Sequence, residues 1–321
     1  MMVPGVIIKA CRLAPEGFGK GLSNLVLYIA QPALIFMAYL LPFDKEILIN
    51  SIYVLAFSVL AHILFSVISL SCFKKSPDNT RRMLRFATIF SNAAFMGIPL
   101  IAAVLEETYP GATLYASIYN ITFNLFLWSL GVYICTDDRD EDGDGVTDGD
   151  IATDYHEVRK KKKSSGSIAK ALLHPVTIAA GIGLIFFFLP IHTYVPEVLV
   201  QTFTNLKNLV APLSMLVLGL RLADIDFKGC FKDKDMYLFL ALRHIALPLL
   251  LIIIFKLLAL FGLVISEVVV LVVIILAAAP AATSATMFAE KFDCDAVYVS
   301  RLVTISTLIS IVTIPLILLL V

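Results

Sequence analysis

Nine apolar blocks, each close to the length that crosses a bilayer, constrain this chain more than any other feature. About 20 helical residues span the hydrocarbon core. The blocks run over residues 21–41, 47–72, 84–105, 112–135, 174–190, 200–222, 236–261, 264–289 and 296–320, after a shorter apolar piece at residues 1–10. Only 16% of the residues are charged, against about 25% in soluble proteins. The sequence therefore predicts an all-α membrane protein of about ten transmembrane helices, with a truncated first helix.

The Lys and Arg residues of the loops fall almost entirely on one side. If the first apolar piece crosses once, the loops alternate between two faces. One face then carries 21 Lys and Arg residues and the other carries 2, Lys45 and Lys207. Cytoplasmic loops hold the excess of such residues. We therefore expect a plasma or inner membrane protein whose basic face is cytoplasmic and whose termini both lie outside.

Residues 136–170 separate two apolar halves. This stretch is acidic from Thr136 to Asp154 and ends in the basic cluster Arg159–Lys163. It has too few apolar residues to form a core, so we expect a disordered cytoplasmic linker. Residues 140–151 resemble a calcium loop, but the twelfth position is Ile151 where such loops need Glu, which favours a plain acidic linker.

Two proline-containing stretches interrupt apolar blocks at matching places in the halves. They are Ser91–Pro99 and Ala277–Ser284. A structural kink is the simpler interpretation of either one alone. Two broken helices in register instead point to the substrate site of a transporter.

A short internal repeat supports this register. Leu22–Val26 reads LSNLV and Leu206–Val210 reads LKNLV, each followed by a proline. The distance along the sequence from the Asn of the motif to the proline of the break is similar in the two halves. It is 75 residues from Asn24 to Pro99 and 72 residues from Asn208 to Pro280. Five segments per half is an odd number, so the halves enter from opposite sides. The pattern predicts inverted five-helix repeats, residues 1–135 and 171–321, with crossing broken helices.

The first break offers the strongest candidate binding residues. Gly97 is flexible, and Pro99 has no backbone N–H, so a half-helix starting near them would present its positive dipole end to a cavity. That end suits an anion such as a carboxylate. Asn92, seven residues before Pro99, can both donate and accept hydrogen bonds.

Further candidates lie on the second break and on the apolar block at residues 112–135. Pro280 interrupts the second helix, and Thr283 and Ser284 follow it, although such hydroxyls often bond to their own helix. Tyr119 and Asn120 could line the same site. Packing in the core, with a satisfied hydroxyl, is the alternative for Tyr119.

Arg243 and His244 lie about two turns inside the apolar block at residues 236–261. An ionisable residue at that depth is a candidate for holding an anion or moving a proton. The alternative, which we favour slightly, is that Arg243 extends to the cytoplasmic surface. The sequence contains neither a metal-ligand pattern nor a nucleophile–base arrangement, so we expect no cofactor, no metal and no enzymatic activity.

Several segments resemble the auxin efflux carrier family, which belongs with the bile acid and arsenite transporters. The most specific match is Asn92 to Pro99, with Met96-Gly97-Ile98-Pro99 in the crossover helix. Further matches are Leu22–Phe36, His174-Pro175, Leu213–Leu222, Ala279-Pro280, Met287–Lys291 and Thr307–Pro315. The resemblance covers essentially the whole chain.

This resemblance implies a scaffold part and a transport part that move relative to each other, with substrate bound where the broken helices cross. The family's binding asparagine falls at Asn92, its second crossover proline at Pro280, and a polar position of its fifth helix at Tyr119 or Asn120. Ser91 stands where plant carriers have proline, and the block at residues 47–72 lacks their acidic–basic pair. These differences argue against auxin. The short linker resembles that of bacterial-type relatives, which implies a small carboxylate such as malate or malonate.

The sequence thus predicts a secondary carrier that moves a small organic anion across the bilayer by an elevator-like motion. A sodium-coupled symporter of the bile acid type and a non-transporting membrane sensor are the alternatives. We expect a carboxylate substrate and lipid as partners, and no nucleic acid. A homodimer is compatible with the sequence.

Overall fold

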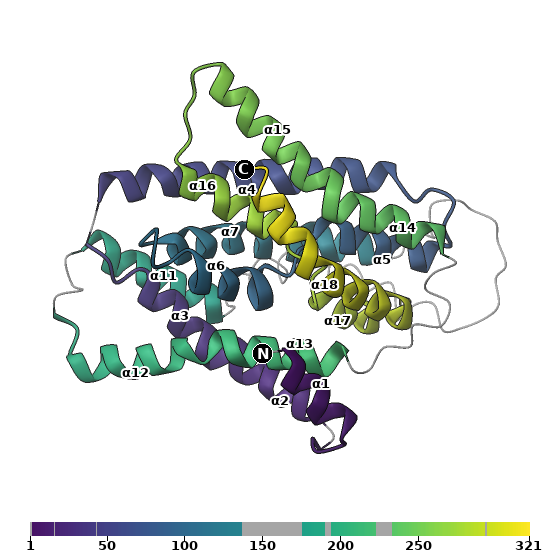
Figure 1. The fold of residues 1–321 in the computed structure, drawn as a ribbon, viewed down its shortest axis with the longest axis horizontal. Coiled ribbons are helices and arrows are strands. Elements are labelled where there is room, and N and C mark those ends of the chain that lie inside the picture. Colours follow the sequence, from purple (N-terminus) through teal and green to yellow (C-terminus); the bar gives the residue numbers. More distant parts are fainter. Residues whose placement is uncertain are drawn as a thin grey trace, which may run out of the picture.

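The computed structural model describes residues 2–15, 17–42, 44–136, 175–189, 194–222, 233–292 and 294–321. Helices are the regular elements of these ranges, and the only extended pairing in them is a bridge between Ser91 and Ala281 (Figure 1). Residues 137–170 of the linker, with the calcium-like stretch and the basic cluster, lie outside the described residues, as does His174.

The helices of the first half follow the predicted blocks. They are α1 (Met2–Ala10), α2 (Phe18–Leu25), α3 (Gln31–Ala38), α4 (Lys45–Ser71), α5 (Asp78–Ile89), α6 (Ile98–Val104), α7 (Ala112–Phe126) and α8 (Val132–Cys135). Three π-helical turns complete them: Val26–Ala30 joins α2 to α3, Ala93–Gly97 leads into α6, and Leu127–Gly131 joins α7 to α8.

The second half has the same order of long and broken helices. They are α11 (Pro175–Phe188), α12 (Glu197–Asn208), α13 (Val210–Leu222), α14 (Lys234–Ala241), α15 (Leu247–Leu260), α16 (Glu267–Ala278), α17 (Ser284–Lys291) and α18 (Ala296–Leu318). The π-helical turn Leu242–Ala246 joins α14 to α15.

Six continuous helices of the described chain are long and apolar enough to cross a membrane. They run over residues 18–38, 45–71, 112–135, 197–220, 234–260 and 296–318. Shorter apolar helices cover residues 93–104, 175–188 and 267–278. Each of the nine predicted blocks therefore contains an apolar helix, and blocks 84–105 and 264–289 are the two that break.

Three of the π-helical turns end two residues before a proline, at Pro32, Pro99 and Pro248. Proline cannot donate to the carbonyl four residues earlier, and its ring clashes with that carbonyl. One wider turn moves this carbonyl away and keeps the helix continuous. Proline therefore widens these helices and does not end them.

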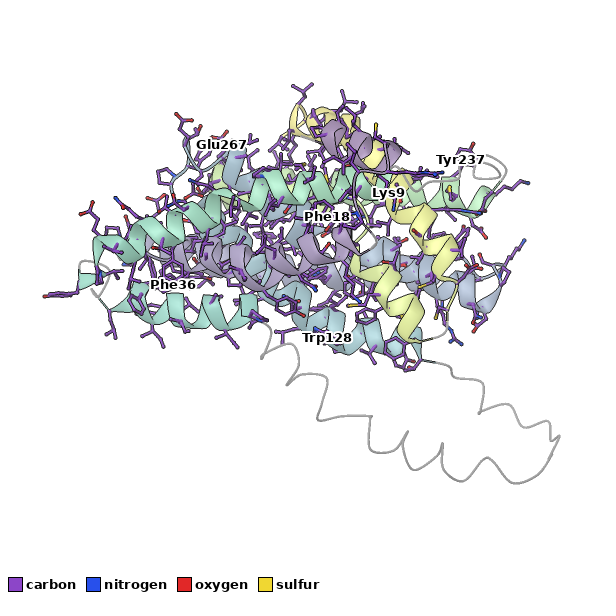
Figure 2. The ribbon with its side chains drawn as sticks, turned by 90° about the horizontal axis from the view of Figure 1, so that it is seen from below. Lys9, Phe18, Phe36, Trp128, Tyr237 and Glu267 are labelled. Carbon is purple, nitrogen blue, oxygen red and sulfur yellow. The ribbon has the colours of Figure 1, made fainter. Side chains whose placement is uncertain are left out.

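Two bundles pack side by side (Figure 1). The small bundle contains α1, α2, α3, α11, α12 and α13, with α1 on α13 and α3 on both α11 and α12. The crossover bundle contains α4 to α8 and α14 to α18, with α4 and α16 on α7 and with α18 on α5. Helices α4 and α12 run along the long axis, whereas α15 and α18 cross it obliquely (Figure 1). Tyr237 and Glu267 lie toward opposite ends of this axis (Figure 2).

Helices at corresponding positions of the two halves exchange partners. α1 packs on α13, and its counterpart α11 packs on α3. In the same way α5 packs on α18 while α16 packs on α7, and α4 packs on α16 while α14 packs on α5. Each of these contacts joins a helix of the first half to a helix of the second half.

Candidate functional site

The two broken helices cross at their interruptions. α5 ends at Ile89 and α16 ends at Ala278, and each chain then runs extended for a few residues. Asn92 N–H donates to the carbonyl of Pro280 at 2.7 Å, and Ala282 N–H donates to that of Phe90 at 2.9 Å. The two interruptions therefore supply each other with the hydrogen bonds that their backbone groups lack within their own helices. The membrane interior requires this, because no water is present there to accept or donate such bonds.

The first helix breaks several residues before Pro99, the position from which the break was predicted. Asn92 has φ −77° and ψ 53°, and the second half-helix already starts at Ala93. Gly97 N–H donates to the carbonyl of Asn92 at 3.0 Å, so it is used inside the helix. The expected half-helix start at Gly97–Pro99 is wrong, because the π-helical turn accommodates Pro99 within the first turn of α6.

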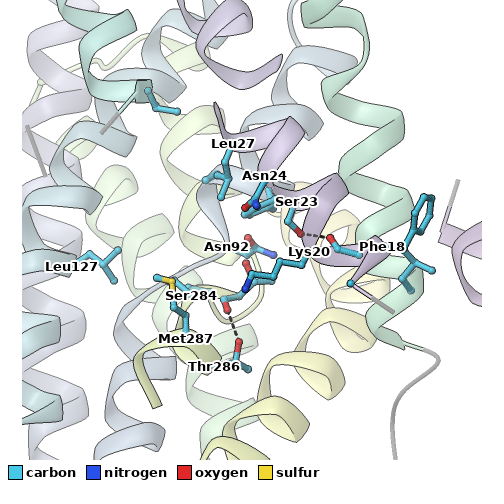
Figure 3. Close-up of a pocket in the computed structure, with 18 of the residues that line it drawn as sticks. Phe18, Lys20, Ser23, Asn24, Leu27, Asn92, Leu127, Ser284, Thr286 and Met287 are labelled. Carbon is cyan, nitrogen blue, oxygen red and sulfur yellow. Dashed lines mark hydrogen bonds between the residues drawn. The ribbon is translucent and has the colours of Figure 1, made fainter. Parts of the chain in front are cut away.

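A cavity of about 1000 Å³ lies between the small bundle and the crossover. Residues of both bundles line it, and Lys9, Phe18 and Trp128 among them are labelled in Figure 2. The polar and charged lining side chains are Lys9, Arg12, Lys20, Ser23, Asn24, Ser91, Asn92, Asn120, Asn124, Thr283, Ser284 and Thr286. Figure 3 shows Asn92 and Ser284 facing Lys20 and Asn24 across it.

Four buried polar atoms of this lining have no hydrogen-bond partner among the described residues. They are Ser91 Oγ, Asn92 Nδ2, Asn120 Oδ1 and Ser284 Oγ. Only 2% of the surface of Asn92 and of Asn120 is exposed. A buried polar group without a partner costs about 1–3 kcal/mol, so this cavity provides for a polar occupant.

Both second half-helices begin at the cavity wall. Ala94 and Phe95 belong to the first turn of one, and Thr283 and Ser284 begin the other. Helix N-termini carry partial positive charge and open N–H groups, which favour anions.

Three basic side chains add to this positive potential. Lys9, Arg12 and Lys20 line the cavity from the small bundle, and no Asp or Glu occurs among the described residues that line it. Lys20 extends from α2 toward Asn92 and Ser284 (Figure 3). The cavity wall is therefore suited to a negatively charged molecule.

Arg243 does not extend to the surface. It has 0% exposure. Its Nε and Nη2 donate to the carbonyl of Ala279 at 3.1 and 2.7 Å, and its Nη1 donates to that of Thr88 at 3.1 Å. The predicted surface position is wrong, because the carbonyls at the ends of two interrupted helices offer hydrogen bonds that lipid cannot.

His244 supports the crossover from the same turn. Its Nε2 lies 2.8 Å from Ser306 Oγ, and its Nδ1 lies 3.1 Å from Thr313 Oγ1. Ser306 Oγ in turn accepts the N–H of Ala281 at 3.0 Å. Arg243 and His244 thus hold the backbone of the crossover and do not line the cavity.

The structure separates the predicted site residues into two groups. Asn92, Asn120, Thr283 and Ser284 meet at the large cavity. The others do not line it: Gly97 and Pro280 are buried in the crossover, Tyr119 packs 5.4 Å from the His62 ring, and Pro99 lines a second hollow of about 380 Å³. Gly97, Pro99 and Pro280 therefore shape the path of the backbone and do not present side chains to the large cavity.

Several cavity residues were not among the predicted site residues. Asn24 belongs to the repeated LSNLV motif, and Asn124 follows Asn120 by one helical turn, so both had a signal in the sequence. Lys20 had none beyond its contribution to the charge asymmetry. Only the tertiary structure, which places α2 across the cavity from the crossover, brings it to the site.

Within the described ranges, no group of three or more His, Cys, Asp or Glu side chains could hold a metal ion. The site is thus a cavity of neutral polar groups, helix N-termini and basic side chains.

Comparison with known proteins identifies the family. A search among curated proteins found no match. The family described as membrane transport protein matches residues 6–318, nearly the whole chain. It is a family of membrane transporters and not of enzymes. The chain is therefore a multi-pass transporter that belongs to the auxin efflux carrier and membrane transport protein family.

Proposed function

We propose that this protein is a secondary carrier for a small organic anion, a mono- or dicarboxylate such as malate or malonate. The observation that carries the proposal is the set of unpartnered buried atoms of Asn92, Asn120 and Ser284 in a cavity with basic side chains. The family match supports the transport function.

The carboxylate would sit at the crossover. Asn92 Nδ2 and Ser284 Oγ are free to donate to its oxygens, and the N-termini at Ala93 and Ser284 stabilise its charge. Asn120 Oδ1 accepts from a hydroxyl of the substrate or from water. Gly97 and Pro280 contribute by shaping the backbone, and Thr283 by lining the site.

We infer an elevator-like motion of the crossover bundle along the small bundle. The exchange of helix partners supports two inverted five-helix repeats, residues 1–135 and 171–321. The two hollows lie toward opposite ends of the helix over residues 18–38, as alternating access requires. The basic end faces the cytoplasm in this proposal, with both termini outside the cell.

Uptake into proteoliposomes tests this function. The purified protein is reconstituted, and flux is measured for a panel of radiolabelled carboxylates that includes malate, malonate and indole-3-acetate. We expect a small aliphatic carboxylate to give the highest flux. Asn92→Ala removes one hydrogen bond to a charged group, which should lower kcat/KM about 10- to 100-fold.

Asn50→Ala is the matched control. Asn50 is another buried asparagine of the crossover bundle, but it donates to the Tyr115 hydroxyl at 3.4 Å outside the cavity. It should keep the KM of the parent. Absence of flux for every carboxylate would refute the carrier function, and full activity of Asn92→Ala would refute the site.

A further inference from the structure

Two hydrogen bonds join the α3 segment of the small bundle to the crossover bundle. Gln31 Nε2 donates to the carbonyl of Ala94 at 2.7 Å, and a bond of 2.7 Å joins the Tyr39 hydroxyl, just after α3, to Ser117 Oγ of α7. We propose that these two α3 bonds hold the crossover bundle in the position seen here and break each time the cavity changes the side to which it opens. This inference rests on the proposed elevator-like motion.

The carbonyl of Ala94 is open to Gln31 because of Pro99. Where a helix contains a π-helical turn, a carbonyl accepts from the residue four or five positions later. For Ala94 these residues are Ile98, whose N–H donates to the carbonyl of Ala93, and Pro99, which has no N–H. The small bundle therefore supplies a hydrogen bond that this half-helix cannot make for itself.

Gln31 is held only in part by this bond. Its side chain has 0% exposure, and its Oε1 has no hydrogen-bond partner among the described residues. The amide group is oriented by Ala94, because only the NH₂ end can donate to a carbonyl. A buried acceptor left unpaired is unfavourable. The present position of the crossover bundle thus satisfies one end of the amide and not the other, which lowers the cost of leaving it.

Tyr39 is fixed to the small bundle and reaches the crossover bundle with its hydroxyl. It has 0% exposure, and a Cβ atom at Gly183 of α11 would lie 2.8 Å from its Cβ and Cδ2. Tyr39 follows Gln31 by eight positions, about 12 Å along a helix axis. The two α3 bonds therefore act at separate points of one helix.

Both bonds depend on where the crossover bundle lies along α3. Each starts on the small bundle and ends on a different element of the crossover bundle, so displacement of that bundle as one body breaks both. Ala94 also lines the large cavity, two positions after Asn92. Gln31 and Tyr39 are thus positioning residues, which stabilise the arrangement that forms this cavity and do not line it.

A buried position in the smaller hollow measures how often the other arrangement forms. Val210 of α13 lines that hollow and is 1% exposed. Val210→Cys, in a background without the native cysteines, is labelled with a maleimide, which reaches the thiol when the hollow widens. We expect Gln31→Leu and Tyr39→Phe each to raise the labelling rate about 3- to 10-fold. The two factors should multiply in the double variant, because distant sites act independently.

Two matched controls remove bonds that do not cross between the bundles. Ser69→Ala removes a bond from Ser69 Oγ to the carbonyl of Arg85 at 3.1 Å, between α4 and α5. Tyr115→Phe removes the hydroxyl that accepts from Asn50 at 3.4 Å, between α4 and α7. Both controls should keep the labelling rate of the parent. An equal rise in the controls, or no rise in Gln31→Leu and Tyr39→Phe, would overturn the proposal.

The labelling needs no substrate, so it is separable from the carrier function. Faster labelling in Gln31→Leu and Tyr39→Phe, in a parent that moves no carboxylate, would refute the proposed substrate and keep the role of the α3 bonds. Carboxylate flux with unchanged labelling would do the reverse. If Gln31→Leu does not give a folded protein, Tyr39→Phe decides, and labelling at the parent rate then overturns the proposal.

Discussion

Lys20 is the basic side chain that Figure 3 shows reaching from the small bundle toward the crossover. Lys20 lines the cavity together with Asn92 and Ser284, but unlike Asn92 it is exposed to solvent. A charge in that position attracts an anion over a distance and is screened by salt. Its role is thus distinct from that of Asn92, whose unpartnered Nδ2 acts only at contact.

Lys20→Gln should raise the KM for the carboxylate several-fold at low ionic strength, with a difference that shrinks as salt is added. Flux in proteoliposomes at two salt concentrations measures this. Lys75→Gln, which removes an exposed charge far from the cavity lining, is the control. A salt-independent loss in Lys20→Gln would indicate a direct contact or a structural role.

At the scale of the element, close backbone approach fixes how α1 packs on α13. A Cβ atom at Gly5 would lie 2.4 Å from the Leu216 carbonyl oxygen and 2.9 Å from Cα of Gly219. Small residues at such contacts allow membrane helices to pack tightly. The short first helix therefore belongs to the small bundle through a contact between backbones.

Gly5→Ala should destabilise the protein by about 1–3 kcal/mol, because α1 must move off α13. Gly21→Ala in α2 meets no atom within 4 Å and should be neutral or slightly stabilising, since alanine favours helix by up to about 1 kcal/mol. Thermal unfolding in detergent compares the two. Equal melting temperatures for the two variants would contradict this packing.

At the scale of the whole molecule, the repeated motif reaches both hollows. Asn24 of the first copy lines the large cavity, and Asn208 of the second lines the smaller one with Lys207 and Pro99. Both asparagines are exposed. The two copies therefore stand at the mouths of two hollows toward opposite ends of the small bundle.

Asn24→Cys and Asn208→Cys, made in a background without the native cysteines, should react with a membrane-impermeant maleimide from opposite sides of oriented vesicles. A transported substrate should change the two labelling rates in opposite directions, because opening one hollow closes the other. Labelling of both positions from one side would refute the alternating arrangement.

The sequence by itself determined the elements and the family. Each of the nine blocks contains an apolar helix, because hydropathy over about 20 residues is a local property that the membrane imposes. The two broken helices were predicted from their prolines and small residues. Four candidate residues, Asn92, Asn120, Thr283 and Ser284, meet at one cavity because they lie on the elements that cross or flank the breaks.

Tertiary structure alone decided where the first helix breaks and what Arg243 does. Pro99 sits inside α6 because a π-helical turn absorbs it, and the break falls where Ser91 can pair with Ala281. Arg243 bonds to Thr88, 155 positions away, so no local pattern could reveal its partner. A polar side chain inside the membrane bonds to backbone carbonyls that have no partner in their own helix. Those carbonyls come near Arg243 only when distant segments of the chain pack together.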